Sequence, residues 1–194
     1  MIRLLLLSCL TYGLLLCSQT TSGATHTVLP TSEDSVPYMK KAADFIREVY
    51  GEDKPGSQFI LVDRPAGKKD LHCGDEVIDD TLTFTKAERD YIRQQIDPGN
   101  RRWTTEYFKH TSIISEDTIK SIFADQSKRW KYFYQHFGQE FHYFSLPVFL
   151  RNDTYCLFYS DIYCGNLCGD GELVLYRKVN GKWVVVKSYC SWIS

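Results

Sequence analysis

A short segment rich in cysteine and glycine carries the residue types best suited to a stiff binding surface. Two cysteines four residues apart, three glycines and an Asp-Gly pair occupy nine positions: Tyr163, Cys164, Gly165, Asn166, Leu167, Cys168, Gly169, Asp170 and Gly171. Glycine is required where φ is positive or where backbones approach closely, so we expect a tightly folded loop. Loops held on a rigid sheet are where binding residues concentrate.

Three interpretations of this segment follow from its chemistry. A Cys164–Cys168 disulfide can simply shape a hairpin, as in many small secreted domains. A stiff loop can also be presented to a protein or cell-wall partner, because preorganisation lowers the entropic cost of binding. Two thiolates can instead hold zinc, but a structural zinc site needs a second ligand pair, which His72 and Cys73 would have to supply. We expect the disulfide, and therefore no metal and no cofactor.

Two histidines and a carboxylate form another candidate zinc set: His136, Glu140 and His142. The helix before them is expected to end at Gly138, so they cannot share one helical face, and packing against aromatic neighbours is the alternative. The sequence supports a cysteine nucleophile at Cys73 even less than it supports this zinc set. Adjacent residues of an extended segment point to opposite sides, so His72 cannot be its base.

An acidic stretch lies between residues 70 and 80. Its carboxylates suggest calcium, but they lack the alternating ligand spacing of known calcium loops, so we expect a solvated acidic loop. The sequence contains no Gly-x-Ser-x-Gly, no phosphate-binding glycine loop and no His-Glu-x-x-His motif. These absences give no support to an enzyme, and we identify no catalytic residue.

Helical periodicity dominates the first part of the chain. Apolar stripes predict helices at 38–50, at 85–96, after Ser115 and at 127–137. Thr85 and Glu88 form a capping box at the start of the second helix. A short apolar run at 59–62 is expected to be a strand.

The last part of the chain has the period of two that strands show. Strands are predicted at 144–150, 154–163, 172–179 and 182–192, with Asn180-Gly181 as a hairpin turn. The element order predicts an α+β fold. N-terminal helices would pack on one face of a curved antiparallel sheet of about four strands, as in cystatin-like or nuclear-transport-factor-like (NTF2-like) domains. Aromatic side chains of that sheet would form either core or a concave ligand pocket: Tyr155, Tyr159, Tyr176 and Trp183.

The first 24 residues are predicted to be a signal peptide. A single cation is followed by an apolar run to Leu16, which is shorter than the ~20 residues of a transmembrane helix, and no later stretch is long enough. Cleavage after Ala24 would release the protein. Alternatively, Leu14-Leu15-Leu16-Cys17 loosely matches a bacterial lipobox, and Cys17 would then carry a lipid anchor. Both outcomes place the protein outside the cytoplasm.

The remaining chain is expected to be a linker at 25–37 and one α+β domain at 38–194. Lys+Arg 23 and Asp+Glu 24 nearly balance, and no basic stripe suggests nucleic acid. Five cysteines follow the leader, and the odd number leaves one without an intrachain partner: Cys73, Cys156, Cys164, Cys168 and Cys190.

Several C-terminal motifs together resemble a group of small, mostly uncharacterised bacterial envelope proteins. They are the Phe-Ser-Leu-Pro-Val-Phe run at 144–149, the Tyr-Cys-Gly-x-Leu-Cys-Gly-x-Gly pattern at 163–171, the Asn-Gly-Lys-Trp at 180–183 and the terminal Ser-Trp-Ile-Ser. The resemblance implies a bacterial, extracytoplasmic protein and brings no activity. We therefore expect a non-enzymatic envelope domain that binds a protein or cell-wall partner through the stapled loop. The alternative is a small-ligand binder or hydrolase that uses the concave face of the sheet.

Overall fold

The computed structural model describes residues 35–51, 59–71, 74–108 and 110–194. The predicted signal peptide, Cys17 and nearly all of the predicted linker lie outside these residues, as do His72 and Cys73.

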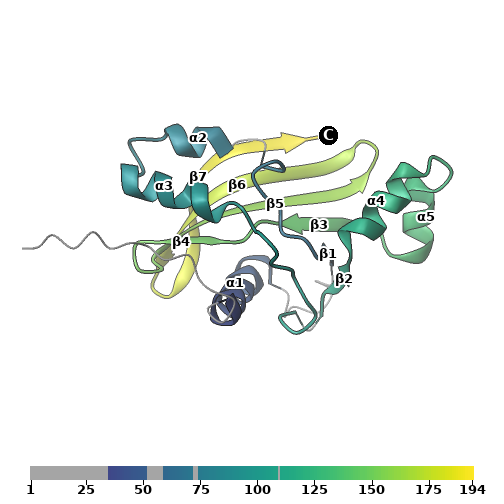
Figure 1. The fold of residues 1–194 in the computed structure, drawn as a ribbon, viewed down its shortest axis with the longest axis horizontal. Helices are drawn as coiled ribbons and strands as arrows, with labels where there is room; N and C mark the ends of the chain where they lie inside the picture. The colour runs from purple at the N-terminus through teal and green to yellow at the C-terminus, as the bar shows by residue number, and fades with distance from the viewer. Residues whose placement is uncertain (1–34, 52–58, 72–73, 109) are drawn as a thin grey trace, which may run out of the picture.

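The described chain is a mixed α+β fold (Figure 1). Its helices are α1 Ser35–Tyr50, α2 Gly74–Asp79, α3 Lys86–Gln95, α4 Glu116–Ala124 and α5 Arg129–His136. Its strands are β1 Ile60–Val62, β2 Ser112–Ile114, β3 Phe141–Phe144, β4 Val148–Leu150, β5 Tyr155–Gly165, β6 Cys168–Val179 and β7 Lys182–Ile193.

One open sheet of seven strands runs through the molecule, in the order β2-β1-β3-β5-β6-β7, with β4 also paired to β5. The antiparallel meander β5-β6-β7 was expected, but the estimate of about four strands was too low. Two additions explain the difference. β1 and β2 extend the sheet through parallel pairing with β3 and with each other. The predicted strand at 144–150 is two strands, β3 and β4, which both pair with β5 and are separated around Pro147.

Helices cover both faces of this sheet, not one. Successive residues of a strand point to opposite faces. In β5, Phe158 packs with Phe45 and other residues of α1, whereas Leu157 and Tyr159 pack with Val77 of α2 and Ile92 of α3. Figure 1 shows α1 and the α2–α3 pair on opposite sides of the sheet. The expectation that the helices pack on one face of the sheet was therefore wrong.

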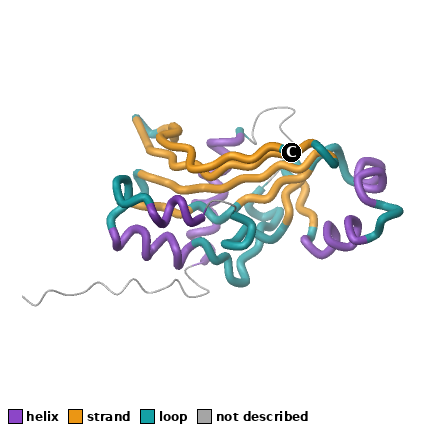
Figure 2. Tube along the Cα trace, turned by 90° about the horizontal axis from the view of Figure 1, so that it is seen from above, coloured by secondary structure: helices purple, strands orange, loops and turns teal. Residues whose placement is uncertain are grey.

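The third group of helices stands at one end of the sheet. α4 and α5 project beyond β1 and β3 (Figure 2). Ile119 and Ile122 of α4 and Phe133 of α5 pack against Phe141 of β3 and Val62 of β1. On the α2–α3 face of the sheet, a cavity borders this cluster and is lined by residues of α4, α5, β3, β5 and β7.

Local sequence signals account for several element ends. Thr85 caps α3, and the reciprocal contacts with Glu88 confirm the predicted capping box. Asn180 and Gly181 have φ of 51° and 82°, which confirms the hairpin turn between β6 and β7. The acidic stretch contains α2 and is not a loop throughout, because Asp75 and Glu76 lie in its first turn, where carboxylates favour the helix.

Candidate binding site

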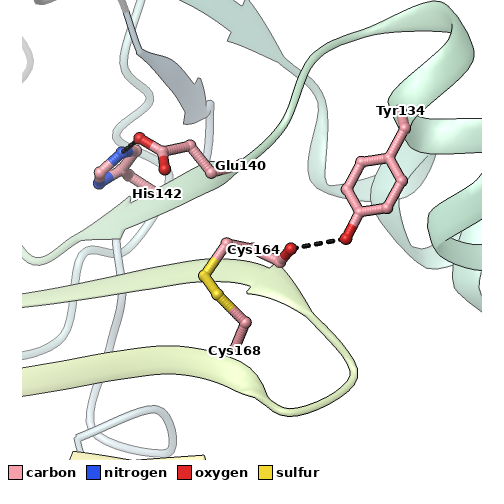
Figure 3. Close-up of a disulfide and its surroundings, with 5 residues drawn as sticks. All are labelled: Tyr134, Glu140, His142, Cys164 and Cys168. Atoms are coloured by element: carbon pink, nitrogen blue, oxygen red, sulfur yellow. Dashed lines mark hydrogen bonds and ion pairs between the residues drawn. A yellow bond between two sulfur atoms is a disulfide. The ribbon is translucent and has the colours of Figure 1, made fainter.

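The cysteine- and glycine-rich segment is a β-hairpin closed by a Cys164–Cys168 disulfide, with 5.0 Å between the two Cα atoms (Figure 3). β5 continues to Gly165 and β6 starts at Cys168, so only Asn166 and Leu167 form the turn. The expectation of a nine-residue loop was therefore wrong, since most of these residues belong to paired strands. Leu167 at the tip is 88% exposed.

The hairpin is anchored to the helix at the end of the sheet. The Tyr134 hydroxyl of α5 donates a hydrogen bond of 2.6 Å to the carbonyl oxygen of Cys164 (Figure 3). A Cβ atom at Gly165 would lie 3.2 Å from that hydroxyl oxygen, so glycine permits the close approach. The disulfide closes the hairpin, and this hydrogen bond attaches it to α5.

The glycines of the hairpin make room for a tryptophan. Positive φ was the expected reason for some of them, but among the described glycines it occurs at Gly51, Gly99 and Gly181. Gly171 pairs with Trp192 of β7, and a Cβ atom at Gly171 would overlap the Trp192 indole and the Asp161 carboxylate. A Cβ atom at Gly169 would lie 3.2 Å from the same indole. Close approach of a side chain, and not backbone conformation, requires glycine at 171.

A buried carboxylate lies in the middle of this arrangement. The sheet register aligns Tyr143, Asp161, Gly171 and Trp192 in one row across four strands, so these positions share a face. Asp161 is 3% exposed. The indole Nε1 of Trp192 donates to its Oδ1 atom at 3.0 Å and to the Tyr159 hydroxyl at 3.1 Å. A neutral indole N–H thus holds the buried carboxylate on this face of the sheet.

A cavity of about 670 Å³ opens above this row. The hairpin forms one wall, α4 and α5 form another, and the segment after β1 forms a third. Its lining residues are Lys69, Asp70, Glu116, Ile119, Phe123, Trp130, Phe141, Tyr143, Asp161, Tyr163, Gly165, Asn166, Trp192 and Ser194. The volume lies in the range of ~300–1,000 Å³ that is typical of small-molecule sites.

Aromatic rings form a nearly continuous surface along the cavity. Trp130 of α5 stacks on Phe141 of β3, with 5.5 Å between ring centroids and 19° between planes. Phe141 stacks on Tyr163 of β5 at 5.4 Å and 20°. Tyr163 then meets Trp192 of β7 at 5.5 Å and 43°. Residues from three strands and one helix thus border one space. Within this line Phe141 lies between Trp130 and Tyr163 and is 4% exposed, and Trp130 also stacks on Tyr134 of α5.

Carboxylates surround the tyrosines of the cavity. The pKa of Tyr163 is raised to about 12, mainly by burial and also by the charges of Asp161 and Asp70. Burial also raises the pKa of Tyr143, and the charges of Glu116 and Asp70 act in the same direction. Both phenols therefore stay protonated at neutral pH and can donate or accept hydrogen bonds.

Glu116 is held by two cations at the edge of the cavity. Its carboxylate lies 2.8 Å from the Arg64 guanidinium and 2.8 Å from the Lys120 ammonium. Burial alone would raise the pKa of Glu116, but the hydrogen bonds from Lys120 and Arg64 lower it below the usual value. This carboxylate is therefore ionised and already bridged, whereas Asp70 accepts a backbone hydrogen bond from Gly67 at 2.8 Å.

The other candidate sites have structural roles. His142 is buried among Tyr50, Phe59 and Phe144 and lies 3.3 Å from Glu140, away from the disulfide (Figure 3). His136 stacks on Tyr132, and the zinc set is not assembled. Within the described residues, no group of three or more His, Cys, Asp or Glu side chains is placed to hold a metal ion.

The acidic stretch also has structural contacts. Asp80 binds the Lys187 ammonium at 2.7 Å and accepts a hydrogen bond from the Tyr189 hydroxyl at 2.9 Å. Burial would raise its pKa, but these bonds and those from Thr83 lower it well below the usual value. Asp80 thus ties the segment after α2 to β7.

The cysteines outside the hairpin differ from one another. Cys156 is the free cysteine of the described part of the chain, and it is completely buried beneath α1, where burial raises its thiol pKa. Such a thiol is unreactive. Cys190 is disulfide-bonded. Cys73 lies outside the described residues.

Of the two alternatives for the aromatic residues of the sheet, core or concave pocket, the structure shows core. Tyr159 and Tyr176 are buried in the two cores on opposite faces, and Tyr155 and Trp183 pack at their margins. The cavity instead contains Trp130 and Trp192, which lie in the predicted helix at 127–137 and the predicted strand at 182–192, and Phe141, which lies between predicted elements. The sequence offered one signal for this cavity. Trp192 lies two residues after Cys190, on a strand that pairs with the glycines.

Among the helices that the structure describes, none is long and apolar enough to cross a membrane. Comparisons with models of protein families, with curated proteins and with solved structures find no match to this chain. The function therefore has to be inferred from the geometry of the cavity and the hairpin.

Proposed function

We propose that this chain is an exported, non-catalytic domain of the bacterial cell envelope that binds a cell-wall polymer. The binding site is the aromatic cavity together with its wall, the Cys164–Cys168 hairpin. The observation that carries the proposal is the line of rings from Trp130 through Phe141 and Tyr163 to Trp192 in one open cavity. Rings offer large apolar contact surfaces, and nearby polar groups orient a ligand.

The cavity favours a protruding chemical group over a flat protein surface. Protein interfaces of standard size bury ~800 Å² on each partner, usually on a broad and nearly flat area. The site here is a hollow with aromatic walls and a buried carboxylate at its base. A wall polymer presents short sugar and peptide groups that can enter such a space, which is why we select it over a protein partner.

The predicted signal peptide and the Cys164–Cys168 disulfide support a location outside the cytoplasm. A signal peptide would direct the chain out of the cytoplasm, and disulfides such as Cys164–Cys168 persist in oxidising compartments. Lipidation at Cys17 would keep the domain at a membrane, whereas cleavage after Ala24 would release it. Either N-terminus leaves the cavity able to meet the wall.

Co-sedimentation with purified insoluble peptidoglycan tests the proposal, using protein purified after export. Trp130→Ala removes a ring of the cavity and is expected to weaken binding at least about tenfold, as loss of a central aromatic anchor does. Trp183→Ala is the matched control, because Trp183 is also half-buried but packs near α1. It should bind like the unmodified protein.

Two results would overturn the proposal. Equal binding by the Trp130 variant and the unmodified protein would remove the cavity from the function. Soluble sugar or peptide products released from the polymer would show a hydrolase, which is the alternative function, instead of a binding domain.

A further inference from the structure

We infer that the cavity takes an organic ammonium group, bound against aromatic faces and near the Asp161 carboxylate. This inference rests on the proposal that the cavity is the binding site, and it adds the chemical class of the bound group. The primary amine of a diamino acid and a quaternary ammonium share this chemistry.

The lining of the cavity carries the first part of the argument. A cation is attracted to the face of Trp, Tyr or Phe because the ring quadrupole is negative there. Six aromatic side chains line this one cavity: Phe123, Trp130, Phe141, Tyr143, Tyr163 and Trp192. Organic ammonium ions are the ligands for which such aromatic enclosures are known to be effective.

Charge carries the second part. The lining contains three carboxylates, Asp70, Glu116 and Asp161, and one ammonium, Lys69. Arg64 and Lys120 bridge Glu116, so this carboxylate is balanced from outside the cavity lining. Asp70 and Asp161 then outweigh Lys69, which is exposed. The lining side chains thus include more carboxylates than ammonium groups, which favours a cationic group over an anionic one.

The position of Asp161 carries the third part. Its carboxylate lies at the base of the cavity and is held by the Trp192 indole, which also forms part of the wall. An ammonium that enters against the ring of Trp192 therefore comes close to Asp161. In the shielded interior of a cavity, attraction between opposite charges is stronger than in bulk water.

Titration with defined probes, followed by tryptophan fluorescence and calorimetry, tests this inference. Choline and its uncharged isostere 3,3-dimethylbutan-1-ol have the same shape and differ in charge. Nα-acetyl-lysine amide and Nα-acetyl-norleucine amide are the corresponding pair for a primary ammonium. We expect at least one ammonium probe to bind about tenfold more tightly than its neutral isostere. The pair with the larger preference for its charged member shows whether the bound group is a quaternary or a primary ammonium.

Substitution separates charge from shape. Asp161→Asn should remove most of the preference for the charged probe and leave the neutral probe unchanged. If asparagine at position 161 prevents folding, Asp70→Asn serves the same purpose. Circular dichroism checks the fold of each variant. Glu106→Gln is the control, since Glu106 is exposed and does not line the cavity.

The outcomes distinguish this inference from the proposed function. Equal affinity for charged and neutral probes, or no binding of either ammonium probe, overturns the inference. If peptidoglycan still binds in a Trp130-dependent manner, the proposed function stands without it. Ammonium binding that is lost in Asp161→Asn, without any binding of peptidoglycan, would support the ligand class and reject the wall polymer.

Discussion

Gly171→Ala is the substitution that tests most sharply how the cavity is built. The new Cβ atom would overlap both the Asp161 carboxylate and the Trp192 indole, so one of them must move. Overpacking of this kind costs about 1–3 kcal/mol. Displacement of the indole also breaks the Nε1 hydrogen bond to Asp161 and Tyr159, which costs about 1 kcal/mol more.

The opposing effect is smaller. Alanine reduces the conformational entropy of the unfolded chain relative to glycine, which stabilises the folded state by about 0.4–1 kcal/mol where the backbone permits it. The net loss of unfolding free energy is therefore about 1–3.5 kcal/mol, by combination of these terms. For a domain of this size the corresponding decrease in Tm is about 2–14 °C.

Urea denaturation followed by fluorescence and circular dichroism measures this loss. Gly74→Ala is the matched control, because a Cβ atom there would lie 3.9 Å from its nearest neighbour, Leu71, which is an ordinary contact. Its unfolding free energy should not fall, and the lower entropy of the unfolded chain should raise it by about 0.4–1 kcal/mol. If Gly171→Ala is as stable as Gly74→Ala, the indole does not lie against Gly171, and the derived cavity wall is wrong.

Three further predictions concern the staple and two ionisable groups. Cys164→Ser with Cys168→Ser should lower the unfolding free energy by about 2 kcal/mol, the loop-entropy value for so short a ring, as measured by urea denaturation without reductant. Glu88→Gln should cost about 1–2 kcal/mol at pH 7, because Glu88 binds the partly exposed Arg151 at 2.7 Å and solvent screens part of that attraction. Since the pKa of Glu88 is lowered to about 2, mainly by Arg151 against an opposing effect of burial, the unmodified protein should lose this stability as pH falls from about 4.5 towards 2. Burial lowers the pKa of His142, against the opposing effect of Glu140, so the unfolded state binds the proton first and unfolding free energy should fall as pH drops below about 6.5.

Each of these predictions has a result that contradicts it. Unchanged stability of the double serine variant would mean that the strand ladder alone fixes the hairpin. An acid unfolding curve for Glu88→Gln that parallels that of the unmodified protein would show that the Arg151 pair adds nothing. For His142, the His142→Phe variant is the comparison, and equal stability loss between pH 7.5 and 5 in both proteins would assign the effect to other groups.

The sequence predicts those features that depend on neighbouring residues. The Thr85–Glu88 capping box and the Asn180-Gly181 turn are set by side chains and backbones a few positions apart, and both are present. The Cys164–Cys168 disulfide is also local, since it joins adjacent strands across a two-residue turn. Such contacts need no knowledge of the rest of the chain.

Features that depend on distant segments were not predicted. β1 joins the sheet through the pairing of Leu61 with His142, and three-residue strands carry too little alternation to reveal such a partner. The cavity likewise combines the segment at 69–70, α4, α5 and the last strand. In the sequence, Trp130 is simply one more ring on a helical stripe, and only packing shows that it stacks on Phe141 and borders a cavity.

The indole N–H resonances of the protein provide the most direct test that the cavity is a binding site. The chain has four tryptophans. Trp130 and Trp192 line the cavity, whereas Trp103 is buried near α1 and Trp183 packs beside it. On titration with a soluble disaccharide-peptide fragment of peptidoglycan, we expect the Trp130 and Trp192 signals to shift in a saturable manner while the other two stay in place. No shift at any indole, or equal shifts at all four, would contradict a ligand site in this cavity.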